Sequence, residues 1–522
     1  MPHIWKYVCE RARFFVGASS AALALSVFAS VSQAQWVPQQ QAQPQPSFGQ
    51  TQPIANYWED TNEQENEQGE VEENDDPIAS LTKRLDELEE SYGKLSSSYE
   101  ELDDAHSDLK KSLKGYAKTG HSGATMKVNG RVHADLWGFP DTSPGTNGFE
   151  NNDPNISVQD RIGFRRMRFG VKGDLPYNML YKIEMEFAGG NNSEFRDAYI
   201  GWKELPVFQT LLLGNQKRPY GLDHLNSSRY NVFLERPFVV EGFNQDARRF
   251  GLASYGVSDN QAWNWRYGLY NTRLIQDEGI YDSDHWQSEI TGRLANTIWY
   301  DESSDGRGYA HWAVSGSYVN VDQNGGIDGQ AGPESRFRQR GEARHISRWL
   351  DTGFIPGADE YGLIGLEGVI NVGRFQMVGE YLAVSMDRIG FEDANFDGGY
   401  VYISYFLTGE HIPWDRKSGT LGRVTPFENF FLVNRCCGGK GGGMGAWQVA
   451  LRYSFADFSD EDVFGGEGES LTLGVNWHWT KYARMQFNYI YGEIDNNAGN
   501  AAPGAPDFGN YHILGARFMV DF

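Results

Sequence analysis

The chain has 522 residues, a formal net charge of −24 and a mean hydropathy of −0.55. After about residue 31 no stretch approaches the roughly 18 apolar residues of a membrane helix, which excludes a helical membrane protein, and the acidic balance argues against nucleic-acid binding. Glycine (61 residues) and aromatic residues (14%) are abundant, which is typical of many strands joined by turns.

The first 34 residues have the three parts of a secretory signal peptide. A short basic segment precedes an apolar stretch over residues 14–31, and Ser32-Gln33-Ala34 supplies the small residues of a cleavage site. We predict a signal peptide over residues 1–34, with an uncleaved anchor helix as the alternative.

Cleavage leaves Cys436 and Cys437 as the only cysteines, so no disulfide framework holds the mature chain together. The two adjacent thiols lack the spacing of a zinc site, and a vicinal disulfide and two unpaired thiols both remain open. The sequence contains no ordered set of Ser, His and acidic residues. We therefore predict no catalytic residue, no metal and no cofactor.

Residues 35–77 have the composition of a disordered linker. Residues 35–58 carry no charge and are rich in Gln and Pro, and residues 59–76 hold ten acidic side chains and no Lys or Arg. Such a segment cannot bury a core, and its like charges repel one another. We predict disorder over this whole linker.

A heptad pattern follows over residues 78–118. Apolar and aromatic residues recur with 3-4 spacing for nearly six heptads, which predicts an α-helical coiled coil. Because tyrosine occupies several seam positions and needs a wide interior, we predict a homotrimeric coil in the periplasm, roughly 60 Å long. The seam residues are Ile78, Leu81, Leu85, Leu88, Tyr92, Leu95, Tyr99, Leu102, His106, Leu109, Leu113 and Tyr116.

From about Met126 the hydrophobic period changes to two. Val132 and Leu136 share one face of the first predicted strand, and Arg131 and His133 share the other. Charged faces suit the wet lumen of an outer-membrane barrel, and closure leaves no exposed edge. We predict an all-β fold after the coil: an antiparallel transmembrane β-barrel of about 16 strands over residues 125–522. A soluble β-sandwich or propeller is the alternative.

Several short motifs occur in order along this region. Through them the chain resembles the phosphate-selective porin O and P family over about residues 126–522. The resemblance implies a trimeric, 16-stranded outer-membrane channel with inward-folded loops and basic residues along the anion path. The motifs include Arg165-Arg166-Met167-Arg168-Phe169-Gly170-Val171-Lys172-Gly173, Gly214-Asn215-Gln216-Lys217-Arg218-Pro219-Tyr220-Gly221-Leu222-Asp223, Arg248-Arg249-Phe250-Gly251 and Gly474-Val475-Asn476-Trp477.

Basic residues on the predicted lumen faces are the candidates for an anion path. Arg166, Arg168 and Lys172 share one strand face, where residues two apart lie about 6.6 Å from each other, so they form a ladder of cations. Residues 217–249 are expected to fold inward and narrow the pore, and Arg165, of opposite parity, is expected at a rim. The candidate pathway residues are Arg131, Arg166, Arg168, Lys172, Lys217, Arg218, Arg229, Arg236, Arg248, Arg249, Arg452 and Arg484.

We predict a porin, not an enzyme, through which small anions, phosphate among them, diffuse passively across the outer membrane of a Gram-negative-type envelope. The expected partners are small anions, outer-membrane lipid, two further copies of the chain and, through the coil, the cell wall or another periplasmic component. Two alternatives are a non-selective porin and a structural tether whose coil spans the periplasm. For the arginines, the alternative is that carboxylates such as Glu184 and Glu186 pair with them and stiffen the wall.

Overall fold

The computed structural model describes residues 123–189, 193–244, 247–275, 286–321, 335–431, 433–434 and 438–522, and, before them, 85–86, 88–94 and 98. The chain divides into two units, of which one contains Gly123–Phe522 and the other is Ala12–Ser122. In the second unit the described residues are helical and fall within the predicted coil. The predicted signal peptide, the linker, most of the coil, Cys436 and Cys437 lie outside the described residues. Within the described part, no helix is long and apolar enough to cross a membrane.

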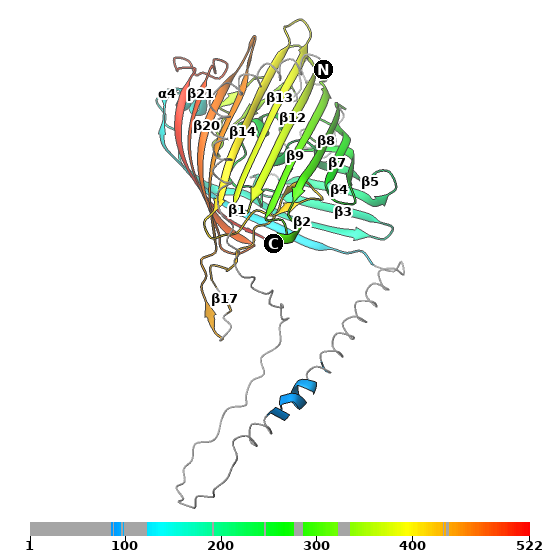
Figure 1. The fold of residues 1–522 in the computed structure, drawn as a ribbon. Coiled ribbons are helices and arrows are strands. Elements are labelled where there is room, and N and C mark those ends of the chain that lie inside the picture. The colour runs from blue at the N-terminus through cyan, green and yellow to red at the C-terminus, as the bar shows by residue number, and fades with distance from the viewer. Residues whose placement is uncertain are drawn as a thin grey trace, which may run out of the picture. The chain divides into compact units, whose positions relative to one another are not determined.

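A closed barrel of sixteen antiparallel strands dominates the first unit (Figure 1). Each strand pairs with the next barrel strand along the chain, and the first strand pairs with the last, where Val132 lies opposite Val520. The predicted strand number and closure are confirmed. The barrel strands are β1 (Lys127–Thr142), β2 (Arg161–Leu175), β3 (Met179–Glu186), β4 (Glu194–Leu205), β5 (Gln209–Lys217), β6 (Arg248–Val257), β7 (Trp263–Asn271), β8 (Ser288–Tyr300), β9 (Gly308–Asn320), β12 (Ala358–Val372), β13 (Phe375–Arg388), β14 (Ala394–Phe406), β19 (Ala446–Asp460), β20 (Val463–His478), β21 (Ala483–Asp495) and β22 (Gly509–Asp521).

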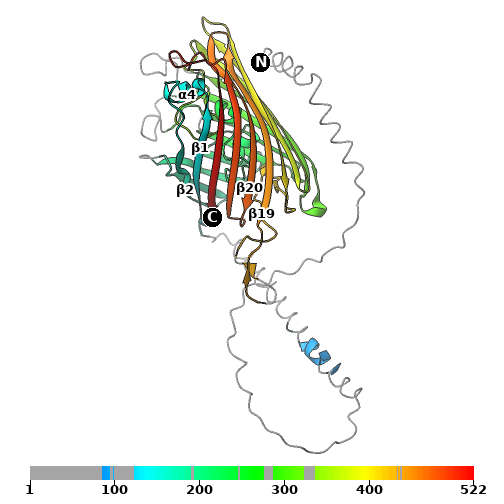
Figure 2. The ribbon, with the colours of Figure 1, turned by 90° about the vertical axis from the view of Figure 1, so that its left-hand side faces the viewer.

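The two ends of the barrel differ in the length of their connections. At one end, called here the turn end, Gly130 and Phe522 exchange backbone hydrogen bonds of 3.0 and 3.1 Å, and most strands are joined by short turns. At the other end, the loop end, longer connections carry the helices α4 (Pro144–Asn151), α5 (Leu222–Leu225) and α6 (Phe238–Phe243). Figure 2 shows α4 at the end of the barrel away from the C-terminus and β1 beside the last strand.

Side chains alternate between the lumen and the outer surface, as the period of two predicts. In β1, Arg131, His133 and Asp135 are buried inside the barrel, whereas Val132 and Leu136 are exposed on its outside. An apolar outer face and a polar lumen are what a barrel in lipid requires.

A β-bulge interrupts this alternation in β2. His133 of β1 lies opposite Arg166, and the next pair joins Ala134 to Phe164, so Arg165 is left without a partner in the ladder. A bulge re-aims a side chain. Arg165 therefore lies in the lumen and not at the rim, where strict alternation predicts it.

The connection between β5 and β6, called here segment 218–247, folds into the lumen in its described part, residues 218–244 and 247. Its helix α6 packs against β13, β14 and β19, and Phe243 of this helix contacts Phe337 and Phe458 with ring centroids 5.3 Å apart. The fit is close, because a Cβ on Gly242 would lie 2.3 Å from the ring of Phe458. This apolar packing fills one side of the lumen and leaves open space beside β2, β4 and β6.

One connection at the turn end, residues 407–445, is long, and part of it also enters the lumen. Trp414 Nε1 donates to Thr297 Oγ1 at 3.0 Å, and the Leu421 N–H donates to Asn226 Oδ1 at 2.9 Å. Inward segments from both ends of the barrel therefore meet. The short elements outside the barrel wall are η1 (Glu302–Ser304), β10 (Arg338–Gln339), β11 (Leu350–Asp351), β15 (Trp414–Asp415), β16 (Thr420–Leu421), β17 (Val433–Asn434) and β18 (Lys440–Gly441).

Candidate anion pathway

A cavity of about 420 Å³ lies inside the loop end of the barrel, and we call it the arginine cavity. Of the described residues that line it, 13 are arginines and two, Glu194 and Glu241, are carboxylates. Arginine presents a planar fork of donors that matches oxyanions and stays charged at neutral pH. The lining arginines are Arg165, Arg166, Arg168, Arg196, Arg218, Arg236, Arg248, Arg249, Arg336, Arg338, Arg340, Arg344 and Arg348.

Carboxylates on the barrel wall orient several of these arginines. Arg168 Nε donates to Glu186 at 2.6 Å, and Arg248 Nε donates to Asp197 at 2.6 Å. Arg218 pairs in the same way with a buried glutamate of β8 at 3.0 Å. Charge-assisted bonds fix the plane of a guanidinium. Because each guanidinium has five N–H donors, such a pair still leaves donors for a permeant anion.

Arg166 of β2 is buried without any such partner. Its side chain lines the cavity, the residue is 4% exposed, and within the described part of the chain no acceptor is in reach of its Nε or Nη1. A buried cation without a partner is unfavourable. An anion that reaches Arg166 supplies the missing partner, which makes this residue the strongest single candidate for a binding position.

The connection between β9 and β12 supplies five more arginines, which the sequence analysis missed. In its part over residues 335–351, called here segment 335–351, Arg336, Arg338 and Arg340 alternate with the buried Ser335, Phe337 and Gln339. The alternation of arginines with other residues in this connection was the sequence signal that could have revealed these lumen arginines.

Three arginines of segment 335–351 have no ion-pair partner among the described carboxylates: Arg338, Arg340 and Arg344. Arg340 donates instead to the carbonyl oxygen of His345 at 2.7 Å. Burial, together with Arg348 and Arg344, lowers the pKa of Arg340 to about 9, so it still carries its charge at neutral pH. The mutual repulsion of these cations favours an anion between them.

Glu235 ties the inward segment 218–247 to the barrel wall. Arg165 donates to it with two hydrogen bonds of 2.7 and 2.9 Å, and Arg517 of β22 donates at 2.7 Å. Burial opposes the charge of Glu235, but Arg165 and Arg517 outweigh it and hold the pKa of Glu235 well below its usual range. The bulge in β2 thus places Arg165 where it anchors the inward segment 218–247.

Six of the twelve candidate residues come together at the arginine cavity, and seven of its arginines were not among the candidates. The structure places the other six candidates elsewhere. Those that line the cavity are Arg166, Arg168, Arg218, Arg236, Arg248 and Arg249. Those not foreseen are Arg165, Arg196, Arg336, Arg338, Arg340, Arg344 and Arg348.

Four candidates lie outside the cavity, and three of them have partners elsewhere in the lumen. Arg131 pairs with Glu184 at 3.0 Å, as the wall-stiffening alternative expects, and Arg452 pairs with Glu342 at 2.8 Å. Lys172 is exposed near the turn end of β2. The Lys217 ammonium donates to three backbone carbonyls at the end of α5, at 2.6 to 3.0 Å, and so caps that helix.

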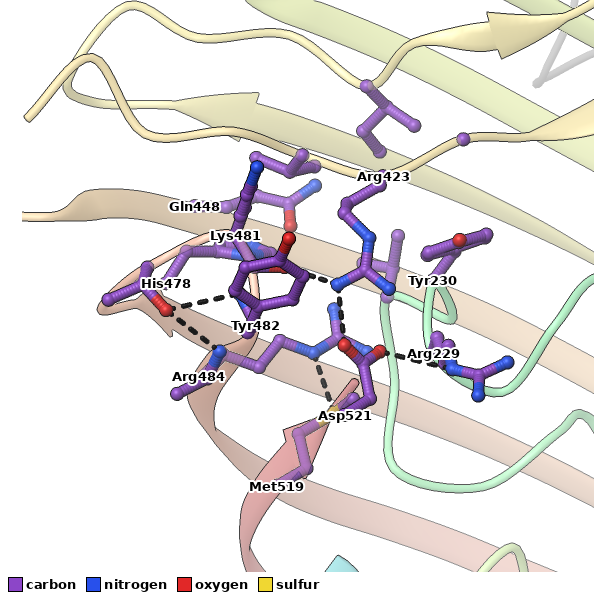
Figure 3. A pocket seen from close by; sticks show the side chains of 16 residues that line it. Arg229, Tyr230, Arg423, Gln448, His478, Lys481, Tyr482, Arg484, Met519 and Asp521 are labelled. Atoms are coloured by element: carbon purple, nitrogen blue, oxygen red, sulfur yellow. Dashed lines mark hydrogen bonds and ion pairs between the residues drawn. The ribbon is translucent and has the colours of Figure 1, made fainter. Parts of the chain in front are cut away.

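The remaining two candidates, Arg229 and Arg484, belong to a second basic cluster near the turn end (Figure 3). Arg229 and Arg423 both pair with the Asp521 carboxylate, and Arg484 donates to the carbonyl oxygen of Asn231 at 2.8 Å. The space beside them is about 20 Å³, enough for about one water molecule. The Asp521 carboxylate thus balances part of the positive charge of this cluster.

The barrel region matches a known family. The sequence model described as phosphate-selective porin O and P matches residues 126–522. An uncharacterized protein of Caulobacter vibrioides is 25% identical over 409 residues, which cover 76% of this chain and 74% of that protein.

Solved outer-membrane structures resemble the barrel distantly. The anion-selective porin from Comamonas acidovorans has a TM-score of 0.46 at 14% identity and covers 76% of this chain and 100% of its own. The outer membrane channel DcaP of Acinetobacter baumannii has a TM-score of 0.45 at 12% identity, with coverages of 77% and 98%.

Proposed function

This chain belongs to the phosphate-selective porin O and P family, and we propose that small anions, phosphate among them, diffuse passively through its barrel. Family membership and the closed barrel support an outer-membrane channel rather than an enzyme.

The composition of the arginine cavity carries this proposal. Thirteen arginines and two carboxylates surround about 420 Å³ of open space inside the lumen. Charges act over about 8 Å in physiological salt, so an ion inside the cavity experiences these arginines far more than the net charge of −24 spread over the whole chain. Arginine-lined constrictions favour anions.

Passage requires that an anion binds and leaves again. Several moderate sites serve this better than one deep site, because a tightly held ion blocks the path. Among the described residues, no acceptor is in reach of Nε and Nη1 of Arg166 or of Nε of Arg338 on segment 335–351. The paired arginines around them, such as Arg168, are already partly neutralised by carboxylates and bind an anion less strongly. Together they provide a graded series of positions.

We extend the proposal to assembly. The seam of residues 78–118, with tyrosine at several positions, supports three helices in one coil. We propose that the channel is a homotrimer whose coil lies in the periplasm.

Arg166→Gln tests the role of the unpaired guanidinium. Glutamine keeps a polar side chain but removes the charge, and the loss of one charge-assisted hydrogen bond, about 1.5 kcal/mol, corresponds to roughly tenfold weaker phosphate binding. We expect the phosphate concentration that half-saturates the single-channel current to rise by that factor in planar bilayers.

The matched control for this experiment is Arg374→Gln. Arg374 is exposed in the turn between β12 and β13 and does not line the cavity. This variant removes the same charge and is expected to conduct like the wild type. Equal saturation curves for both variants would remove Arg166 from the anion path.

A further inference from the structure

Glu150 of α4 is a buried carboxylate on which hydrogen bonds from segment 335–351 converge. The residue is 7% exposed, and its two side-chain oxygens accept from four donors of the segment. Ser347 Oγ adds a fifth bond, to the backbone carbonyl of Glu150 at 2.7 Å. The four donors are Nδ1 of His345 at 2.9 Å, the backbone N–H groups of Ile346 at 2.8 Å and Ser347 at 3.1 Å, and Nε1 of Trp349 at 3.0 Å.

These bonds hold the stretch of the segment that carries cavity arginines. The donors lie at residues 345–349, between or beside Arg344 and Arg348. His345 extends the contact, because its Nε2 accepts from the Gly341 N–H at 2.9 Å, next to Arg340. The imidazole therefore carries its proton on Nδ1 and is neutral.

The bonds from residues 345–349 to Glu150, called here the Glu150 clamp, differ from the ion pairs between arginines and carboxylates on the barrel wall. The clamp joins two connections of the loop end, α4 and segment 335–351, and Glu150 is not among the residues that line the cavity. Other bonds also hold the segment: Arg336 forms an ion pair with Asp351 at its two ends, and Glu342 accepts hydrogen bonds from Arg452 at 2.8 Å and Ser470 at 2.7 Å on the barrel wall. Without Glu150, residues 345–349 lose their bonds to α4, and these residues lie beside Arg344 and Arg348.

We infer that Glu150 is a positioning residue of the channel, which holds segment 335–351 so that Arg340, Arg344 and Arg348 face the arginine cavity. The inference rests on the proposed anion preference. Glu150 acts through the arginines and does not itself contact the permeant ion.

The geometry implies a response to acid. The charged and titratable groups that face the clamp are Arg161 of β2, 3.5 Å from Glu150, and Arg340 and Arg348 around His345. Burial opposes the charge on Glu150, but the bonds from His345 and the backbone outweigh it and lower its pKa from 4.5 to about 2. Burial lowers the pKa of His345 from 6.5 to about 4.

The pKa values of Glu150 and His345 both lie below those of the free side chains, so protonation of either group destabilises the clamp. The clamp is fully formed above about pH 6.5 and weakens as the pH falls, first through the window of His345 and then through that of Glu150. Anion preference is expected to decline with it.

Glu150→Gln in the full-length protein tests the inference. Glutamine has one acceptor oxygen, and its NH₂ group faces donors, so the four bonds cannot all form. Hydrogen exchange of the amides in residues 341–349 measures the clamp directly, and the reversal potential in a salt gradient measures selectivity. Glu392→Gln, an exposed carboxylate of the β13–β14 connection at the same end, is the matched control.

We expect the protection of the Ile346 and Ser347 amides to fall roughly tenfold in Glu150→Gln, which corresponds to about 1.4 kcal/mol, and the anion preference to fall with it. Ser347→Ala, which removes a single bond, is expected to give a smaller fall in both, and the Glu392 variant none. Lowering the pH of the wild type from 7 to 4 is expected to act in the same direction.

Unchanged protection in Glu150→Gln, or lost protection with unchanged selectivity, would overturn the inference while an anion-selective wild type still supports the proposed function. A wild type without anion preference overturns both. If Glu150→Gln does not fold, Ser347→Ala decides, and wild-type protection and selectivity in that variant would then overturn the inference.

Discussion

At the scale of single residues, partners decide what an arginine in the lumen does. Arg165 and Arg168 are neighbours in sequence of Arg166, yet both are held by carboxylates, and Arg166 is not. Lys217 has the residue type of a pathway cation, but the carbonyls of α5 use its ammonium group as a cap. A positive charge on the lumen face is therefore not enough to make a pathway residue, because the side chain must also have donors that protein groups do not already use.

Glu235→Gln tests the carboxylate that ties segment 218–247 to Arg165 and Arg517 of the barrel wall. Breaking a buried ion pair by removing one partner costs about 3–5 kcal/mol, because the other charge stays buried. We expect the free energy of unfolding in urea to fall by that amount. Glu302→Gln removes an exposed partner of Arg416 and is expected to cost at most about 1 kcal/mol.

The difference between wild type and Glu235→Gln also depends on pH. Because the pKa of Glu235 is depressed in the folded state, its contribution is present above about pH 4.5 and is lost as the pH falls. The difference in the free energy of unfolding between the two proteins should therefore be smaller at pH 3 than at pH 7. An equal difference at both pH values would contradict the assigned ion pairs.

At the scale of elements, the regular parts of the chain could be predicted and the irregular parts could not. Strand faces follow from the alternation that separates lipid from lumen, as in β1. The bulge that turns Arg165 inward leaves no trace in a pattern of period two. Segment 335–351 was missed because connections carry no fixed period, and its place in the lumen depends on partners such as Glu150, far away in the sequence.

Removal of residues 35–118 tests the proposed coil at this scale. The described residues that line the arginine cavity lie between Arg165 and Tyr361, so we expect the conductance of each channel and its anion preference to persist. The proposed trimer is expected to dissociate at a lower temperature, which native electrophoresis of the detergent-extracted protein measures. A loss of conduction per channel would show that the coil is part of the pore.

At the scale of the whole molecule, total charge and local charge point in opposite directions. The chain carries −24, while the cavity between the wall and the inward segments is lined by 13 arginines. The sequence predicts the barrel and its strand number, and six of its twelve candidate residues line the cavity. It could not show which lumen cations meet, because the inward segments 218–247 and 335–351 bring distant residues together.

The reversal potential of the wild-type channel in a planar bilayer, with a tenfold gradient of potassium chloride, tests the central claim most directly. The arginine cavity predicts a potential displaced toward the equilibrium potential of chloride, and a fall in chloride current when phosphate is added and competes for the same arginines. A potential displaced toward the equilibrium potential of potassium would contradict the account.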